Sequence, residues 1–413
     1  MSKIRIKNFG PIKEGFKDAD GNKWIDIKKV TLFIGNQGSG KSTVAKLIST
    51  FIWMEKALNR GDFNNKDINE HTVIELLAYQ GIKNYLTDRT EVEFVGDAYN
   101  IKFSPGYATV IRRKAADNYV VPKIMYVPAE RSFLSTVKSA YDVKGLPGPL
   151  TTFAEELKRA NIDSDGIKIN LPIRDYAYLY DNNKDVSQII GADYTINLLE
   201  ASSGLQSLIP LYLVTKSLSD SVSDSIDDAF SSNISVNQRI RMEQELNKIT
   251  RDSNITTEVK EKSAYLVKAR FHNKCFVNIV EEPEQNLFPT SQKAMLDSLV
   301  EFNNMSVGNK LIMTTHSPYL INYLTLSVKA FKVRETLRAQ QKNADDKIKM
   351  IVPIESVIDP IDLVIYELCE KDGTILILKD YKGLPSDENY LNDSLEATNE
   401  QFAQLQEIEK GWL

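Results

Sequence analysis

A glycine-rich segment near the start of the chain has the composition of a phosphate-binding loop. Residues 35–42 read GNQGSGKS and match the pattern G-x-x-x-x-G-K-[ST]. The apolar run 30–34 precedes them, and apolar residues at helical spacing follow them. Glycines let the backbone curl until its N–H groups face phosphate oxygens, and a helix N-terminus adds partial positive charge. The alternative, a chance match, is disfavoured by this strand–loop–helix context, so we expect a nucleotide to bind here.

Two side chains of this loop have the chemistry for separate tasks. Lys41 is expected to reach the β- and γ-phosphates, and Ser42 is expected to be a ligand of Mg²⁺. ATP and Mg²⁺ are therefore the predicted cofactors. The residues expected to contact the nucleotide in this loop are Gly35, Asn36, Gln37, Gly38, Ser39, Gly40, Lys41, Ser42 and Thr43.

A second apolar run, residues 276–280, ends in the adjacent acids Glu281 and Glu282. Two neighbouring side chains at a strand end face different directions, which allows two roles. Glu281 is expected to act on the magnesium ion, and Glu282 to polarise the water that attacks the γ-phosphate. Because acids commonly end strands, the interpretation of these two residues as a Walker B motif depends on the presence of the glycine-rich loop in the same chain.

Small residues open a predicted helix at 200–206, which reads EASSGLQ. Such a helix start leaves backbone N–H groups free and can form a second phosphate site. Since the first loop already holds one nucleotide, the segment is expected to clamp ATP held by another copy of the chain. The alternative is an ordinary capped helix. The residues predicted to contact nucleotide in this way are Ser202, Ser203, Gly204 and Gln206.

One of the three histidines, His316, follows an apolar run at 310–313 within the sequence TTHSP. A histidine at the end of a sheet strand after the Walker B acids can sense the γ-phosphate and the attacking water. The alternative is an incidental histidine. The predicted catalytic residues are therefore Lys41, Glu282 and His316.

The elements that must position these residues indicate an α/β fold. Apolar or alternating runs predict strands, and the runs at 276–280 and 310–313 are typical of buried parallel strands. We expect a single domain over residues 1–413. Its expected parts are an antiparallel β subdomain at 85–122, a short helical insertion at 213–263, and a C-terminal part at 320–413 that completes the domain and ends in a polar helix at 401–412.

Composition limits the classes of function. The 413 residues are 42% apolar and 26% charged, with a formal net charge of -5, which disfavours a uniformly basic nucleic-acid binder. No uncharged apolar run approaches the ~20 residues of a membrane helix, so no membrane partner is expected. The two cysteines, Cys275 and Cys369, suggest a reducing compartment, and we expect a cytoplasmic protein.

The order of the four motifs, at 35–43, 202–206, 279–284 and 314–318, resembles the ABC-ATPase set: Walker A, signature, Walker B and switch histidine. The opening residues 4–10 and the segment 281–289 are similar to the SMC, RecF and OLD branch. Within that branch the chain looks most like the compact bacterial ATPases of anti-phage defence systems such as PARIS and Septu. The resemblance implies an ABC-type P-loop NTPase with a mixed central sheet that forms a homodimer around two ATP molecules, or a higher oligomer.

The chain also departs from that family pattern. It has no clear Q-loop glutamine; Glu130 or Arg131 is the candidate to couple the nucleotide to the helical part. The helical insertion is far too short for an SMC-type arm. OLD proteins carry clustered nuclease acids after the ATPase part, whereas here only Asp359, Asp362 and Glu367 come close, and we interpret them as surface charges.

Three functions fit these motifs. The resemblance favours an ATP-driven switch that controls a separately encoded effector, a nuclease or toxin, in anti-phage defence. A RecF- or SMC-like ATPase that clamps duplex DNA is the alternative, and a transporter subunit is disfavoured by the signature. The basic residues that could contact DNA, more simply interpreted as a solvated face, are Lys102, Arg112, Arg113 and Lys114.

Overall fold

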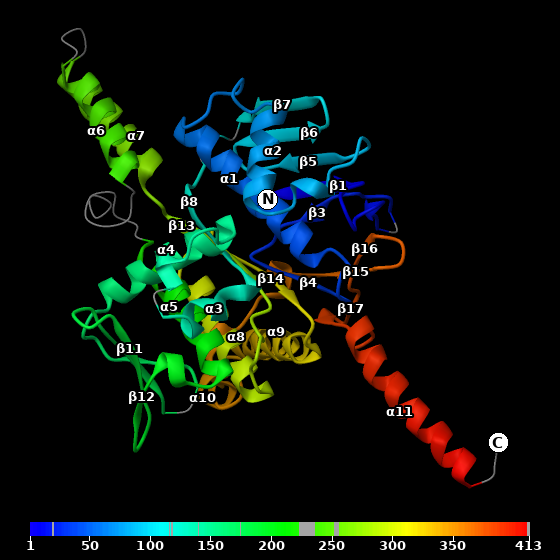
Figure 1. Ribbon diagram of the computed structural model, residues 1–413. Helices are drawn as coiled ribbons and strands as arrows, with labels where there is room; N and C mark the ends of the chain where they lie inside the picture. The colour runs from blue at the N-terminus through cyan, green and yellow to red at the C-terminus, as the bar shows by residue number, and fades with distance from the viewer. Residues whose placement is uncertain are drawn as a thin grey trace.

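The computed structural model describes residues 1–410 except 19, 115, 117–118, 139, 174, 223–235 and 252–255. A seven-stranded sheet runs through its middle in the order β2-β16-β15-β4-β14-β13-β8 (Figure 1). These strands are β2 (Gly15–Phe16), β16 (Thr374–Ile377), β15 (Leu363–Leu368), β4 (Val30–Gly35), β14 (Lys310–Thr315), β13 (Cys275–Glu281) and β8 (Pro122–Val127). The five from β15 to β8 are parallel, whereas β16 is antiparallel to β15. The predicted α/β fold with a mixed central sheet is confirmed.

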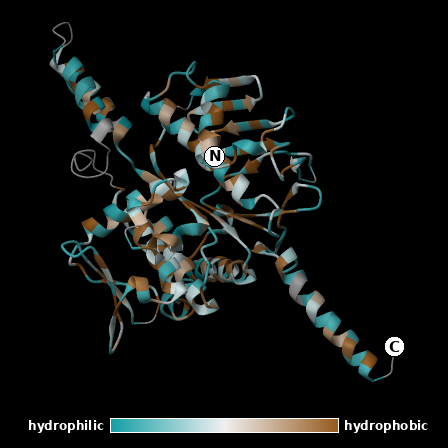
Figure 2. Cartoon of the chain, in the orientation of Figure 1, coloured by the Kyte–Doolittle hydropathy of each residue, from teal (hydrophilic) through white to brown (hydrophobic). Residues whose placement is uncertain are grey.

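The central strands are buried on both faces. Every residue of β4 and β13 is buried, which explains their nearly continuous apolar sequences. Because side chains alternate along a strand, Leu32 and Ile34 join one apolar cluster and Phe33 joins the other. The brown strands in the middle of Figure 2 show this apolar centre. The parallel order brings the carboxyl ends of β4, β13 and β14 to one edge of the sheet.

Helices cover both faces of the sheet. One cluster includes residues of α1 (Lys41–Arg60) and α2 (Glu70–Tyr79). The other includes residues of α4, α5, α8 and α9. Their bounds are Gly148–Asp163 for α4, Ser203–Asp220 for α5, Pro289–Asn304 for α8 and Pro318–Ala339 for α9.

An antiparallel sheet packs on the α1 side, in the order β3-β1-β5-β6-β7. Its strands are β3 (Ile25–Asp26), β1 (Lys3–Lys7), β5 (Glu91–Val95), β6 (Tyr99–Ser104) and β7 (Tyr107–Arg112). The meander of β5, β6 and β7 lies within residues 85–122, but the sheet also includes β1 and β3 from outside that range. Its boundary as a separate subdomain stays a prediction.

A second antiparallel sheet, which the sequence did not lead us to expect, has the order β12-β11-β10-β9. The strands are β9 (Ile169–Asn170), β10 (Ala177–Asp181), β11 (Val186–Ile190) and β12 (Thr195–Asn197). Tyr178, Tyr180 and Ile189 from this sheet are buried in the same apolar cluster as α4 and α5. The sheet therefore packs on α4 and α5, and its last strand, β12, shortly precedes α5 in the sequence.

Two segments project from the body. The helices α6 (Val236–Arg251) and α7 (Thr257–Phe271) form a hairpin held by Met242, Val267 and Phe271, and α11 (Tyr390–Glu409) extends away near the C-terminus (Figure 1). The C-terminal helix begins earlier than the predicted residue 401. Trp412 lies outside the described residues, as do residues 223–235 before α6.

Among the described residues, the remaining short elements are α3 (Phe133–Thr136), α10 (Asp345–Lys349), β17 (Asp380–Tyr381), β18 (Leu384–Pro385) and several 3₁₀ turns. The turns that matter for the site are η3 (Ala129–Ser132) and η5 (Leu198–Glu200). In the part of the chain that the structure describes, no helix combines the length and apolarity needed to cross a bilayer.

Candidate nucleotide site

The glycine-rich loop joins the end of β4 to the start of α1. Gly35 and Gly40 have φ angles of 142° and 101°, which side-chain-bearing residues rarely adopt. A Cβ on Gly35 would lie 2.5 Å from the carbonyl oxygen of Leu368, so the loop can approach β15 only with glycine there. The predicted strand–loop–helix context of residues 35–42 is confirmed.

Lys41 folds back onto this loop. Its Nζ donates hydrogen bonds to the carbonyl oxygens of Gly35 at 2.7 Å and Asn36 at 2.9 Å, and lies 3.4 Å from His316 Nδ1. Burial lowers the pKa of Lys41 to about 8, although the nearby Glu282 raises it. An anion at the loop would offset that cost of burial.

A second observation indicates that the loop suits a phosphate group. The hydroxyl oxygen of Ser39 is buried and has no hydrogen-bond partner among the residues that the structure describes, which is unusual for a native polar atom. A buried hydroxyl that lacks a partner, a desolvated ammonium and the N-terminus of a 20-residue helix meet at one turn. Phosphate oxygens supply the acceptors and the negative charge that all three need.

The two predicted magnesium ligands lie together. Burial raises the pKa of Glu281, while hydrogen bonds from Tyr126 and Ser42 act in the opposite direction. The Tyr126 hydroxyl donates to Glu281 Oε1. Ser42 and Glu281 would hold Mg²⁺, whose charge would neutralise phosphate oxygens.

Glu282 faces a different direction from Glu281, as expected for adjacent residues. Its φ is 44°, and its N–H donates to the carbonyl oxygen of Thr314 at 2.9 Å. Its Oε1 lies 3.4 Å from His316 Nε2, and a hydrogen bond from that histidine lowers the pKa of Glu282 against the effect of burial. Glu282 is therefore an ionised, half-buried carboxylate at the edge of the site.

His316 bridges Glu282 and Lys41, because its two ring nitrogens face these two side chains. Nδ1 faces an ammonium group, which can only donate, and Nε2 faces a carboxylate, which can only accept when ionised. This network assigns the proton of neutral His316 to Nε2. The predicted catalytic residues Lys41, Glu282 and His316 thus form one connected chain.

Glu284 is a site residue that sequence reasoning did not assign a role. Its Oε1 accepts hydrogen bonds from the Thr315 hydroxyl at 2.7 Å and from the His316 N–H at 2.8 Å. Burial raises the pKa of this carboxyl group. Glu284 therefore positions His316 through its backbone. Its place in the acidic tetrad 281–284 was the available signal.

Arg131 joins the Walker B segment to helix α5. It is fully buried, and it donates to the carbonyl oxygens of Glu281 at 2.7 Å, Glu282 at 2.6 Å and Ser207 at 3.2 Å. Burial lowers its pKa to about 10, so the guanidinium stays charged at neutral pH. Of the two candidates for coupling, Arg131 makes these contacts, whereas Glu130 is exposed. The coupling role itself stays a prediction.

The predicted signature turn opens α5. Ser202 is the residue before the helix and makes no side-chain capping bond, and both Ser202 and Ser203 are exposed. A Cβ on Gly204 would lie 2.9 Å from the carbonyl oxygen of Asn286, so glycine permits close packing on the loop after the Walker B acids. Gln206 is buried instead, and its amide donates to Leu198 and Leu199 carbonyl oxygens. Its contact with nucleotide stays a prediction.

The acids near the C-terminus have local structural roles. Asp359 caps the turn at Ile361, and Glu367 accepts a hydrogen bond from the N–H of Tyr390 at the start of α11. Among the residues that the structure describes, no three His, Cys, Asp or Glu side chains gather into a metal site.

The family described as AAA ATPase domain matches residues 149–321. The chain is an ATP-hydrolysing enzyme. The matched range covers less than half of the 413 residues; it contains the signature turn, both Walker B acids and His316, but not the loop at 35–42. A comparison with curated proteins finds no match.

Solved structures with a similar chain path include SMC heads and an ABC cassette. An SMC head bound to the C-winged helix domain of ScpA has 11% identity and a TM-score of 0.39, covering 91% of this chain and 95% of that one. The SMC head domain from Thermotoga maritima has 11% identity and a TM-score of 0.38, covering 92% and 98%. The ATP-binding cassette MJ0796, a dimer bound to ADP and Pi, has 11% identity and a TM-score of 0.27, covering 92% and 100%. At such values these likenesses decide neither fold nor function.

Proposed function

We propose that this ATPase closes into a homodimer around ATP and thereby switches a separately encoded effector, a nuclease or toxin, in bacterial anti-phage defence. The observation that carries the proposal is the division of the site. Lys41, His316 and Glu282 form a connected chain at the edge of the central sheet, while the signature turn presents exposed serines at a helix N-terminus. A second copy of the chain supplies what one copy leaves exposed.

The residues of the site have separate tasks in hydrolysis. Lys41 would exchange its carbonyl acceptors for phosphate oxygens, and Ser42 with Glu281 would hold the magnesium ion. Glu282 accepts the proton of the attacking water, because its ionised carboxylate can act as a base. His316 donates from Nε2 to Glu282 and so keeps that carboxylate in place, and Glu284 holds His316 in turn.

If a second copy completes the site, the rate of ATP hydrolysis depends on whether the dimer has formed. Phosphoryl transfer depends mainly on positioning, so a site divided between copies turns over only when both are in place. Arg131 gives the nucleotide state a route to α5, because it bonds to the backbone of both Walker B acids and of Ser207. The defence role and the effector are supported by the resemblance of the motifs, a fold-level analogy.

The test compares wild type with Glu282→Gln. Wild type should hydrolyse ATP, whereas Glu282→Gln should bind ATP, fail to turn it over and accumulate as a dimer in light scattering. Glu335→Gln on the exposed face of α9 is the matched control and should behave as wild type. Wild-type turnover by Glu282→Gln would move the base elsewhere, and a monomer with ATP bound would contradict the dimer.

A further inference from the structure

A cavity of about 320 Å³ lies between α1, α2, β8 and α4. This volume is at the small end of the range for ligand pockets. Aromatic rings from three of these elements line it: Trp53 from α1, Tyr79 from α2 and Tyr126 from β8. Such walls suit a flat ring system.

One buried polar atom on a residue of the cavity wall lacks a hydrogen-bond partner among the described residues. Gln80, which follows α2, is 5% exposed, and its Oε1 accepts no hydrogen bond within the described structure. Its Nε2 lies 3.5 Å from the hydroxyl of Ser49, at the limit of a hydrogen bond. Buried acceptors without a partner are uncommon and call for an explanation. A ligand N–H in the cavity would supply the missing donor.

The cavity also offers no partner for a charged ligand. Every lining residue that the structure describes is uncharged at neutral pH, and the polar side-chain groups are hydroxyls, the Trp53 indole N–H and the Gln80 amide. A charged molecule would lose its hydration without an ion pair in return. The occupant that fits is therefore uncharged.

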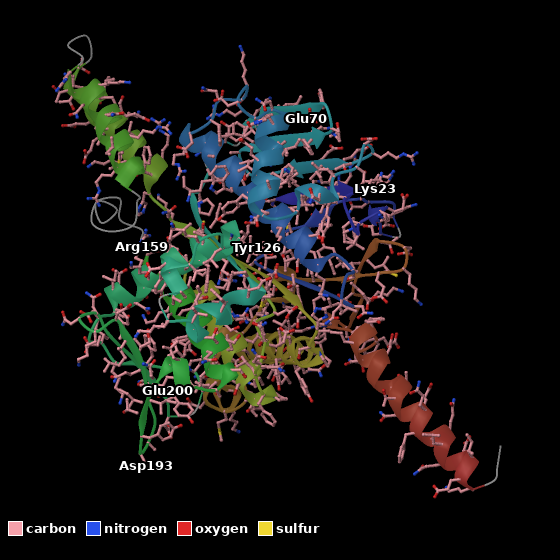
Figure 3. All side chains as sticks on the ribbon, viewed as in Figure 1. Lys23, Glu70, Tyr126, Arg159, Asp193 and Glu200 are labelled. Atoms are coloured by element: carbon pink, nitrogen blue, oxygen red, sulfur yellow. The ribbon has the colours of Figure 1, made fainter. Side chains whose placement is uncertain are left out.

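We propose that this cavity binds a flat, uncharged heteroaromatic molecule whose ring N–H donates to Gln80 Oε1, and that its occupancy alters ATP turnover through Tyr126. The Tyr126 ring lines the cavity, while its hydroxyl donates to the Walker B residue Glu281. Figure 3 shows Tyr126 near the middle of the molecule, between the N-terminal part and the α4 region. One side chain thus touches both sites.

The cavity also lies at a joint between helices. The Tyr79 hydroxyl, on α2, is 2.6 Å from the Thr152 hydroxyl on α4, and both residues line the cavity. A ligand between α2 and α4 would fix their spacing, so a change in this joint with nucleotide state would alter ligand affinity. By linkage the ligand would alter nucleotide affinity to the same extent.

The binding test uses 2-quinolinone, a neutral bicyclic lactam with a ring N–H, and 1-methyl-2-quinolinone, which lacks the donor. Calorimetry should show at least tenfold tighter binding of 2-quinolinone by the full chain. Gln80→Met keeps a similar volume and should remove the difference between the two probes. Lys41→Ala should bind 2-quinolinone as wild type does, because the loop at 35–42 is a separate site. No binding, or equal binding of both probes by wild type, would overturn the proposal.

A variant that fills the cavity provides a second test. Ser49 is buried in the cavity wall, and Ser49→Leu should abolish binding of 2-quinolinone while circular dichroism reports a folded chain. If Ser49→Leu does not fold, Thr152→Trp, which fills the cavity from the more exposed α4 side, serves the same purpose. Undiminished binding by a folded filled variant would place the probe elsewhere.

The coupling test measures ATP turnover and rests on the proposed function. Saturating 2-quinolinone should change wild-type turnover at least twofold. Tyr126→Phe should still bind the probe, but the turnover of this variant should be the same with and without the probe. Binding that leaves wild-type turnover unchanged would overturn the coupling. A chain that binds 2-quinolinone but hydrolyses no ATP would contradict the proposed function and leave the cavity assignment standing, so the two failures are distinguishable.

Discussion

The chemistry of the site depends on three side chains that contact one another in series. His316 faces Lys41 through Nδ1 and Glu282 through Nε2, each at 3.4 Å. The ring therefore accepts a hydrogen bond from Lys41 and donates one to Glu282, so its hydrogen bonding depends on the position of Lys41. When Lys41 moves from loop carbonyls to phosphate oxygens, His316 loses its donor on the Nδ1 side. The histidine is thus suited to sense nucleotide at the residue scale.

Replacement of Lys41 tests one end of this series of contacts. Lys41→Ala removes the only charge that the loop itself offers to phosphate, so ATP affinity should fall on the order of a hundredfold, as expected for the loss of charged hydrogen bonds. Isothermal calorimetry measures it, with Lys144→Ala, an exposed lysine in a loop, as the control. Unchanged ATP affinity would remove the nucleotide assignment from residues 35–42.

Glu55 predicts a pH dependence of stability that is unrelated to nucleotide. Its Oε1 accepts from the N–H groups of Ala98 and Tyr99, and burial raises its pKa from 4.5 to about 7. The unfolded chain ionises Glu55 at lower pH than the folded chain does. The free energy of unfolding should therefore fall as pH rises from about 4.5 through 7, by about 3 kcal/mol in total.

Urea unfolding of the nucleotide-free protein between pH 5 and pH 8 measures this fall. Glu55→Gln keeps an acceptor for both N–H groups and cannot ionise, so its stability should vary less with pH and exceed that of wild type at pH 8. Glu75→Gln, at an exposed position on α2, should keep the wild-type dependence. Parallel pH curves for wild type and Glu55→Gln would show that Glu55 is ionised in the folded state.

At the scale of elements, the N-terminus of α5 carries the next prediction. Ser203 is exposed there and makes no contact that holds the P-loop of its own copy in the described structure. Ser203→Arg should leave ATP binding by one copy intact but slow hydrolysis about a hundredfold, because the clamp acts on the partner's nucleotide. Thr336→Arg on the exposed face of α9 is the control for an added arginine.

A mixture of variants sharpens this test. Ser203→Arg retains an intact loop at 35–42, and Lys41→Ala retains an intact signature turn. A mixed dimer then contains one complete site, so mixing two inactive variants should restore part of the wild-type turnover. Inactivity of the mixture beside full activity of Ser203→Arg alone would exclude a site divided between copies.

Sequence reasoning succeeded where the determinants are local. The loop at 35–42 carries its glycines, lysine and serine within eight residues, and its flanking strand and helix follow from apolar spacing. Arg131 could be named only as a candidate, because its partners Glu281 and Ser207 lie far away in sequence. Strand β15 was missed because its place beside β4 depends on pairing across more than 300 residues. The β9–β12 sheet was missed because its strands are short and gain their burial from α4 and α5.

At the scale of the whole molecule, the arrangement of charge bears on the alternative of a DNA clamp. Lys102 is paired with Glu93 at 2.8 Å, and Arg113 donates to the carbonyl oxygen of Gly96. Lys102 and Arg113 are thus engaged within the protein, and the chain as a whole has a net charge of -5. This distribution favours the interpretation as a solvated face.

Duplex DNA should therefore leave ATP turnover unchanged. Turnover by wild type is measured with and without a 40-base-pair duplex at about 50 mM and 200 mM salt, with Glu282→Gln as the blank, because binding through phosphates weakens steeply over that range. A rate within twofold at both salt concentrations fits a switch triggered by another molecule. Strong stimulation at low salt that disappears at high salt would instead support the clamp. Loss of that stimulation in a Lys102→Glu variant would then place the duplex on the β5–β7 sheet, because reversing this charge repels phosphates.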